Sequence, residues 1–330
     1  MGKIRFGIVG TNFISDWVIT GGLEDERFEP VAVCSRSEQT GQAFAQKYRI
    51  PHVFMSLEEM ASNPLVDAVY IASPNAFHAQ QSMLFMQHGK HVLCEKAFAS
   101  NAHEARRMIE TANRNGVVLM EAMKPTLTPA FKKVIDYLPR IGVPRRYFSC
   151  YCQYSSRYDR LKQGIVLNAF QPELSNGATM DIGVYTIYPM VVLFGKPVAV
   201  HAIGTKLSSG VDGQAAVNFI YNNGMTATVL YGKIADSTLP TEIQGETGSI
   251  RLDRINIIGD VQFINRKGES IPIQPVTKYN EYYYEIAEFI NIIQSGQKES
   301  VINNLSNSLM TMEIADEIRN QLGVRFPADE

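Results

Sequence analysis

Lys96, Asp181 and Tyr185 are the residues of this chain best suited to proton transfer. Lys96 follows Glu95 directly after a strand-like run, and Asp181 and Tyr185 lie four residues apart in a helical pattern. This spacing places a carboxylate and a phenol on one helical face. A nearby ammonium favours the phenolate form of a tyrosine and can polarise a carbonyl group. If the three side chains meet, they can exchange a proton with a substrate hydroxyl.

Each of these residues also has an ordinary structural role. The pair Glu95 and Lys96 is typical of a surface ion pair, Asp181 of a charge that stabilises a helix N-terminus, and Tyr185 of a half-buried ring. These interpretations stay open for each residue taken alone. Only the combination favours catalysis, so the elements that position the residues matter.

A strand-like run, a tight turn and a helical pattern open the chain. In the turn after Gly10, Asn12 and Ser15 replace the second and third glycines of the dinucleotide-binding pattern G-x-G-x-x-G. A helix N-terminus offers N–H groups and partial positive charge to a pyrophosphate, while asparagine tolerates positive φ and serine is small. We expect Gly10, Asn12, Phe13 and Ile14 to contact a dinucleotide. A simple strand-to-helix connection is the alternative.

The residues after the next strand-like run indicate which dinucleotide. An NAD-dependent enzyme usually carries an acid there, which binds the ribose hydroxyls, but this chain has Ser35 and Arg36. A cation beside hydroxyl groups suits a 2′-phosphate. We therefore expect NADP as the cofactor, with NAD as the second possibility. A solvated arginine near the following helix is the alternative for Arg36.

Two later turns add candidate cofactor ligands. After the run at residues 68–72, a proline ends the strand and Asn75 is placed to cap the following helix. His78 falls in the first turn of that helix, where a structural hydrogen bond is the alternative to cofactor binding. Glu95 is expected to pair with Lys96 or to bind the cofactor. The expected cofactor contacts in these turns are Ser73, Pro74, Asn75, His78 and Glu95.

The pattern of elements changes once along the chain. Up to residue 122, strand-like runs alternate with helical patterns, which predicts a parallel sheet with ligands at the carboxyl ends of its strands. From residue 123, consecutive strand-like runs predict a mostly antiparallel sheet. We therefore expect an α/β protein with a dinucleotide-binding domain over residues 1–122 and an α+β substrate domain over residues 123–330.

The individual elements follow from apolar periodicity and turn residues. Strands are expected over residues 5–9, 30–34, 68–72, 91–94 and 117–121, and then over 146–154, 198–203, 215–221, 226–231, 242–245, 249–252 and 261–264. Helices are expected over residues 13–22, 39–48, 57–62, 77–88 and 102–115, and then over 131–138, 182–194, 279–295 and 304–322. The loop over residues 154–170, with Arg157, Tyr158 and Asn168, is expected to line the substrate pocket.

Composition excludes several classes of function. The chain has 330 residues and a net charge of −2, which disfavours nucleic acid and membrane surfaces as partners. We expect no apolar stretch to approach the length of a membrane span, and we expect a cytoplasmic protein. The four cysteines and six histidines lack metal-ligand spacing, so no metal is expected. Cys150 and Cys152 would share one strand face, too extended to bridge readily.

Several motifs together resemble the Gfo/Idh/MocA oxidoreductases, essentially from end to end. They are G-I-V-G-T at residues 7–11, I-A-S-P-N at 71–75 with His78, G-K-H-V-L-C-E-K at 89–96, and the run from Gly177 to Tyr185. The resemblance implies an N-terminal Rossmann domain and a C-terminal α+β domain whose open sheet often mediates homodimers or homotetramers. It also implies NAD(P)-linked oxidation or reduction of sugars, polyols and similar small molecules.

Within this family the chain is similar to the branch that contains glucose-fructose oxidoreductase and dimeric dihydrodiol dehydrogenase, because Tyr185 stands where many members have histidine. The resemblance implies that Lys96 is the catalytic or substrate-orienting lysine, and that Asp181 and Tyr185 bind substrate and transfer its proton. Ala97 replaces the proline that commonly follows the Glu-Lys pair, and Lys124 replaces the tryptophan usual in that branch.

The sequence thus predicts an NADP-preferring oxidoreductase. It would transfer hydride between nicotinamide and the hydroxyl or carbonyl carbon of a sugar-like, polyol or cyclic diol substrate. A non-catalytic NAD(P)-binding sensor of the same fold is the alternative. An S-adenosylmethionine-dependent methyltransferase is a weaker one, disfavoured by the strand-rich second half.

Overall fold

The computed structural model describes residues 2–330, which form two compact units. The first unit comprises the chain up to Lys124 together with Lys278–Ser308, and the second comprises Pro125–Thr277 together with Leu309–Glu330. This division differs from the expected domains at 1–122 and 123–330, because the late segment Lys278–Ser308 packs with the N-terminal unit. A helical pattern in the sequence does not show which domain the helix covers.

The first unit contains a six-stranded, all-parallel sheet in the order β3-β2-β1-β4-β5-β6. Its strands are β1 (Ile4–Val9), β2 (Phe28–Cys34), β3 (His52–Phe54), β4 (Ala68–Ile71), β5 (His91–Glu95) and β6 (Leu119–Ala122). Its helices are α1 (Phe13–Gly22), α2 (Glu38–Tyr48), α3 (Leu57–Ser62), α4 (Asn75–Gln87), α5 (Ala102–Asn115) and α9 (Glu281–Ser295). The strand order reverses between β1 and β4, which is where such sheets bind ligands at the carboxyl ends of their strands.

Polar caps set where the helices of the first unit begin. The side-chain oxygens of Asn12, Ser37, Ser56 and Asn101 accept backbone N–H groups at the starts of α1, α2, α3 and α5. Such caps satisfy N–H groups that have no partner within the helix and stabilise it by about 1 kcal/mol each. Because caps are local, these helix starts agree with the sequence-based expectation to within one residue.

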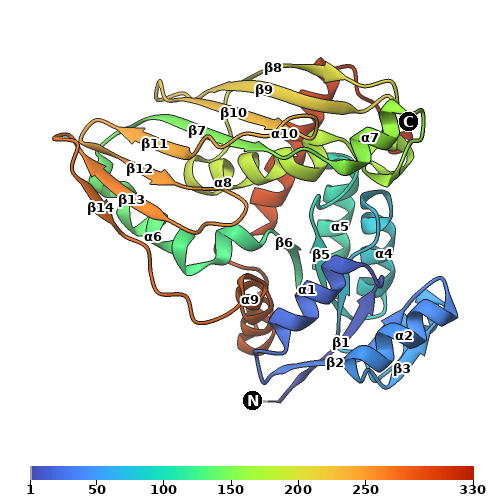
Figure 1. Cartoon of the computed structure of the whole chain (residues 1–330). Helices are drawn as coiled ribbons and strands as arrows, with labels where there is room; N and C mark the ends of the chain where they lie inside the picture. The colour runs from blue at the N-terminus through green and yellow to red at the C-terminus, as the bar shows by residue number, and fades with distance from the viewer. Residues whose placement is uncertain (1) are drawn as a thin grey trace. The chain divides into compact units, whose positions relative to one another are not determined.

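Helix α9 reaches the first unit from the distal part of the chain and lies beside α1 (Figure 1). The two helices approach closely at Gly21, where an added Cβ would lie 2.6 Å from the Cβ of Tyr282. The Phe289 ring of α9 lies 6.0 Å from the Phe6 ring of β1, centroid to centroid. The helix therefore completes the core of the parallel-sheet unit.

The second unit is built on an eight-stranded sheet in the order β14-β13-β12-β11-β7-β10-β9-β8. Only β7 and β10 pair in parallel, and every other neighbouring pair is antiparallel. The strands are β7 (Pro144–Cys152), β8 (Ala199–Lys206), β9 (Asp212–Ile220), β10 (Thr226–Gly232), β11 (Thr241–Gly245), β12 (Gly248–Leu252), β13 (Val261–Asn265) and β14 (Ser270–Pro272). The helices are α6 (Pro129–Tyr137), α7 (Ser156–Lys162), α8 (Val184–Phe194) and α10 (Leu305–Gln321), which belongs to this unit from Leu309 onward. Short 3₁₀ turns occupy Lys124–Leu127, Leu138–Ile141, Asn168–Phe170, Pro172–Leu174 and Pro327–Asp329.

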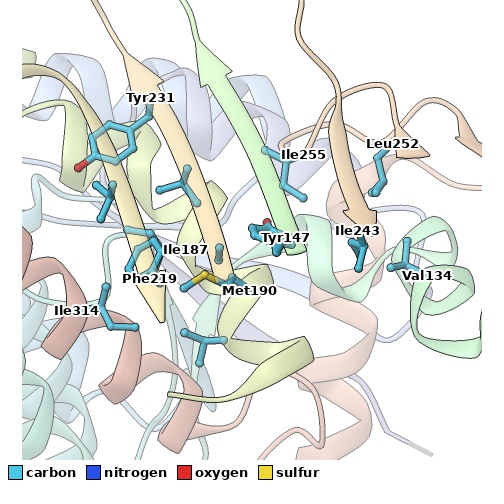
Figure 2. Packing of buried hydrophobic residues seen from close by; sticks show 14 of the residues in the cluster. Val134, Tyr147, Ile187, Met190, Phe219, Tyr231, Ile243, Leu252, Ile255 and Ile314 are labelled. Atoms are coloured by element: carbon cyan, nitrogen blue, oxygen red, sulfur yellow. The ribbon is translucent and has the colours of Figure 1, made fainter. Parts of the chain in front are cut away.

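One face of this sheet packs against α8 to form the core of the second unit. Figure 2 shows Tyr147, Phe219 and Tyr231 of the strands on the side of Ile187 and Met190 of α8. All five side chains are buried. Fully burying one large apolar side chain contributes about 1.5–3 kcal/mol, so this layer holds α8 and the turn before it.

The stretch Pro172–Phe194 is long and apolar enough to span a membrane by length and composition, against the expectation that no stretch would be. Within the second unit, however, 72% of its most apolar window is buried. It includes α8, whose apolar surface faces the sheet. This pattern is that of a core helix.

The fold class is as expected, a parallel α/β unit and a mostly antiparallel α+β unit. The expectation missed β3, β14 and α7, which have three, three and seven residues, because such short elements carry little periodic signal. The helix expected from residue 182 is preceded by a π-helical turn, Thr179–Gly183.

We predict that Gly21→Ala lowers the free energy of unfolding by about 1–3 kcal/mol, the usual cost of overpacking. The new methyl group would also lie 2.9 Å from the backbone nitrogen of Tyr283. Urea denaturation measures the effect. Thr20→Ala, at an exposed position of the same helix, is the control. Wild-type stability of Gly21→Ala would contradict the packing of α9 on α1.

Candidate active site

The turn between β1 and α1 is held closed by side chains. Gly10 has φ +99°, and a Cβ there would lie 3.1 Å from the carbonyl oxygen of Ala72, so the position favours glycine. The Asn12 carboxamide accepts from the N–H groups of Ile14 (2.9 Å) and Ser15 (3.2 Å) and donates to the Ala72 carbonyl (2.7 Å). Asn12 has φ −89° and acts as the helix cap, so it does not adopt the positive φ that its place in the glycine pattern suggested.

The residues after β2 divide into a structural and an exposed part. Ser35 is buried, its hydroxyl lies 2.8 Å from that of Thr40, and it accepts from the backbone N–H of Ser37 at 3.3 Å. Arg36 is exposed. Phe13, at the start of α1, is also exposed. Arg36 is therefore the residue of this turn whose charge is accessible to a ligand.

The turn after β4 places Pro74 at the cap position of α4, and Asn75 is the first helical residue. The expectation that Asn75 caps this helix is therefore wrong. Asn75 is largely buried, and the Ser73 hydroxyl donates to the side-chain carbonyl of Gln81 at 2.7 Å. This turn is fixed by contacts within the first unit.

His78 joins the turn after β4 to the turn after β5. Its Nδ1 lies 2.8 Å from the carbonyl oxygen of Ala97, and its Nε2 lies 2.8 Å from that of Ser73. The ring is fully buried, and burial lowers its pKa. The contacts of His78 are thus structural hydrogen bonds, which was the alternative to cofactor binding.

Glu95 and Lys96 do not form a simple surface ion pair. The Glu95 carboxylate is buried, accepts a hydrogen bond from the Tyr70 hydroxyl at 2.5 Å, and accepts from the backbone N–H of Lys96 at 3.1 Å. Burial raises the pKa of Glu95, and the Lys96 charge opposes that shift. The Lys96–Ala97 peptide bond is cis. Lys96 is half-buried and directly follows β5, where the Glu95 carboxylate holds its backbone N–H.

Two further acids lie in the same part of the first unit and were not singled out from the sequence. Glu121 on β6 and Glu285 on α9 are both almost completely buried. Burial raises the pKa of Glu121 to about 8 and that of Glu285 well above its ordinary value. The charge of Glu95 acts on both in the same direction. The burial of Glu285 could have been predicted from the sequence, because this residue lies on the apolar face of an amphipathic helix.

Lys124 brings a positive charge close to two of these buried acids, Glu95 and Glu285. Its ammonium forms an ion pair with Glu281 and lies 4.5 Å from the centroid of the Tyr282 ring. Its side chain is buried, and its charge opposes the pKa increases of Glu95 and Glu285. The residue that departs from the family branch is thus part of a charge network.

Asp181 belongs to the π-helical turn of the second unit, and Tyr185 to the first turn of α8 that follows. The ring of Tyr185 meets the ring of Tyr151 edge to face at 5.7 Å between centroids. Asp181 forms an ion pair with Lys233, a residue that sequence reasoning missed. Because Lys96 lies in the first unit, the structure describes the predicted trio as two separately positioned parts.

The glycines around Asp181 have steric explanations. A Cβ at Gly183 would meet the Tyr231 ring at 3.1 Å, and one at Gly177, where φ is +135°, would lie 2.4 Å from Oδ1 of Asp212. Asp212 is fully buried, and its Oδ2 accepts from both the backbone N–H and the hydroxyl of Thr179 at 2.7 Å. These contacts determine the course of the turn that carries Asp181.

Comparison with known protein families identifies the chain. The sequence model of an oxidoreductase family with an NAD-binding Rossmann fold matches residues 4–123, and that of the GFO/IDH/MocA C-terminal domain matches residues 140–251. The chain belongs to the Gfo/Idh/MocA oxidoreductase family. This confirms the predicted family, fold class and assignment as an NAD(P)-dependent oxidoreductase. No group of three or more His, Cys, Asp or Glu side chains within residues 2–330 could hold a metal ion.

Full-length relatives support the same assignment. The chain is 50% identical to scyllo-inositol 2-dehydrogenase (NADP⁺) IolU of Bacillus subtilis (strain 168), over 99% of both chains. It is 31% identical to trans-1,2-dihydrobenzene-1,2-diol dehydrogenase of Danio rerio, again over 99% of both. The solved structure of KijD10, a 3-ketoreductase from Actinomadura kijaniata, in complex with NADP and TDP-benzene shares the fold, with a TM-score of 0.84, 22% identity and coverage of 97% of this chain and 98% of that one.

We predict that Glu121→Gln reduces the loss of stability as the pH rises from about 5 to about 8. The folded protein keeps the Glu121 carboxyl protonated up to a pKa of about 8, whereas the ordinary value is 4.5. Between these values the folded state binds more protons than the unfolded chain, so a higher pH destabilises it. Some loss remains in the variant, because burial also raises the pKa of Glu95 and Glu285.

Urea denaturation across this pH range measures the effect. Glu110→Gln, at an exposed position of α5, is the control and should follow the wild-type profile. A Glu121→Gln profile parallel to that of the wild type would show that Glu121 is ionised in the folded protein.

Proposed function

We propose that this protein is an NADP-dependent dehydrogenase that oxidises a ring hydroxyl of scyllo-inositol or of a closely similar cyclic polyol, or reduces the corresponding ketone. The observation that carries the proposal is the 50% identity with scyllo-inositol 2-dehydrogenase (NADP⁺) across 99% of both chains. Lys96, Asp181 and Tyr185 supply side chains for the proton transfer that accompanies hydride transfer.

The residues of the first unit fit a phosphorylated dinucleotide. The close turn at Gly10 and the start of α1 suit a pyrophosphate, and we place Asn12, Phe13 and Ile14 next to it. The exposed Arg36 suits a 2′-phosphate. When bound, the cofactor accepts or donates the hydride. Further proposed contacts are Ser35, Ser73, Pro74 and Asn75.

Two residues first considered as cofactor ligands are proposed to act indirectly. His78 bridges the carbonyl groups of Ser73 and Ala97, and Glu95 accepts from the backbone of Lys96. Both contacts fix the main chain on either side of the lysine. We therefore assign His78 and Glu95 the role of positioning Lys96.

The proton step is assigned to residues of both units. Tyr185 takes the proton of the substrate hydroxyl during oxidation and returns it during reduction. The ammonium of Lys96 is assigned to polarising the substrate carbonyl. Asp181 orients the substrate by accepting a hydrogen bond from a neighbouring hydroxyl.

We further propose that the protein forms a homodimer or homotetramer in the cytoplasm. On the face of the second sheet opposite α8, Ile203 of β8 and Ile220 of β9 are 80% and 44% exposed, and exposed apolar strands often mark an interface. Cys150 and Cys152 lie 3.9 Å apart, sulfur to sulfur, without a disulfide. The two are next neighbours on one face of β7, a spacing that does not bridge readily, so their free state follows from strand geometry.

We predict that Lys96→Met and Tyr185→Phe each lower kcat for scyllo-inositol with NADP⁺ by about 100-fold or more, the range expected for lost proton transfer. NADPH affinity, measured by fluorescence titration, should stay within about twofold of wild type, because the residues proposed to bind the cofactor are different ones. Lys298→Met, at an exposed position, is the control.

Full turnover in either variant would remove that residue from the mechanism. A wild-type protein that binds NADPH tightly yet turns over no inositol, sugar or cyclic diol would instead be a sensor of the same fold.

We predict that Arg36→Ala raises KM for NADP⁺ about 10-fold or more, because a hydrogen bond to a charged group contributes roughly 1.5–3 kcal/mol. KM for NAD⁺, which lacks the 2′-phosphate, should change little. Steady-state kinetics with both cofactors measure the ratio, and Arg114→Ala, exposed at the end of α5, is the control. An equal change for the two cofactors would place the 2′-phosphate elsewhere.

A further inference from the structure

Lys233 is a buried lysine whose main chain is fixed on both sides. It directly follows β10, its N–H donates to the carbonyl of Gly213 at 2.8 Å, and its carbonyl accepts from the N–H of Ser155 at 2.9 Å. Gly213 lies on β9, and Ser155 follows β7. The starting point of the lysine side chain is therefore defined by three segments of the second unit.

The side chain of Lys233 extends to the π-helical turn. It is only 4% exposed, and its ammonium forms an ion pair with Oδ2 of Asp181. The same nitrogen lies 3.4 Å from the carbonyl oxygen of Ala169 and 5.0 Å from the centroid of the Phe170 ring. The Asp181 side chain, by contrast, is 31% exposed. The pair thus has a buried cationic end and an anionic end that reaches solvent.

Asp212 of β9 is the other carboxylate near this lysine. Burial raises the pKa of Asp212, and the charge of Lys233 opposes that shift. Tyr231 of β10 is a further titratable residue in this region, and its hydroxyl lies 2.7 Å from the hydroxyl of Thr179. Burial raises the pKa of Tyr231 well above its ordinary value, so it stays neutral. Asp212 accepts two bonds from Thr179, and the carboxylate that the ammonium contacts directly is that of Asp181.

The energetics favour a fixed pair. A buried ammonium costs several kcal/mol unless a counter-charge compensates it. The ion pair between Lys233 and Asp181 is therefore strongly favoured over separation of the two side chains. A part-exposed aspartate without such a partner samples several rotamers, and each ordering step costs free energy when substrate binds. An anchored carboxylate has already lost that freedom.

We propose that Lys233 positions Asp181, holding its carboxylate in one orientation for the substrate hydroxyl. The proposal rests on the assignment of Asp181 to substrate binding. Lys233 acts through Asp181 and contacts no substrate atom. It is therefore a positioning residue, and its effect must vanish when Asp181 is no longer an acid.

The test compares Lys233→Met, Lys233→Arg, Asp181→Asn and the double variant Lys233→Met/Asp181→Asn in the full-length protein. Kinetics with scyllo-inositol and NADP⁺ are measured across pH, with thermal unfolding for each variant. Lys196→Met is the matched control, because Lys196 pairs with Glu313 on the surface of the same unit.

Lys233→Met is expected to lower kcat/KM for scyllo-inositol about 10- to 100-fold, the usual effect of losing a partner that orients a functional side chain. KM for NADP⁺ should stay within about twofold. The acidic limb of the kcat/KM profile should move to higher pH, because a carboxylate without its cation protonates more readily. Lys233→Arg should restore part of the activity and the wild-type profile, and Lys196→Met should behave as wild type.

The double variant separates positioning from folding. It removes both charges, and its kcat/KM should equal that of Asp181→Asn alone. This comparison decides the proposal even if Lys233→Met does not fold. A further loss in the double variant, or an unchanged pH profile in Lys233→Met, would overturn it. If Asp181→Asn itself keeps full activity, the proposed role of Asp181 fails, and this inference fails with it.

Discussion

The burial of ionisable groups is the constraint on which both parts of the candidate site depend. An ionised carboxylate or ammonium taken out of water costs several kcal/mol unless a counter-charge or hydrogen bonds compensate it. In the first unit the carboxyl groups of Glu95, Glu121 and Glu285 are all buried and burial raises the pKa of each, while the charge of Lys124 opposes that shift for Glu95 and Glu285. In the second unit Lys233 and Asp212 are buried, and Lys233 forms an ion pair with Asp181. Each region therefore tolerates few arrangements of its side chains.

This constraint explains why short motifs carry so much of the structure. Glu95 holds the main chain of Lys96 and is itself held by the hydroxyl of the fully buried Tyr70. In the second unit, Gly183 lies against the ring of Tyr231, and Asp212 caps the turn at Thr179. Small residues and acids appear at these positions because the surrounding groups leave neither space nor an alternative partner.

Local signals made much of the fold predictable. Helices α1 and α5 have the expected bounds, because asparagine caps begin them and their periodic patterns are long. The turn after β1 was recognisable from Gly10, yet the role of Asn12 was not, since capping and positive φ are both common for asparagine. The three residues of β3 are too few to show a period.

Tertiary contacts account for what the sequence could not show. The helix α4 begins at Asn75 itself and its cap position is Pro74, which makes no side-chain capping hydrogen bond, a shift of one residue that propensity does not resolve. Lys233 follows a strand, where lysine is usually solvated, and only the folded second unit reveals its burial. In the same way, the sequence pattern predicted the helix α9 but did not show that this helix packs in the parallel-sheet unit.

The position of α9 in the chain has a consequence during synthesis. The last strand of the parallel sheet ends at Ala122, but the helix that packs on α1 begins only at Glu281. At a translation rate of about 5–20 residues per second, the nascent sheet waits on the order of ten seconds or more with its apolar flank uncovered. During that interval the growing polypeptide exposes apolar surface of the first unit, and synthesis of α9 supplies the missing layer.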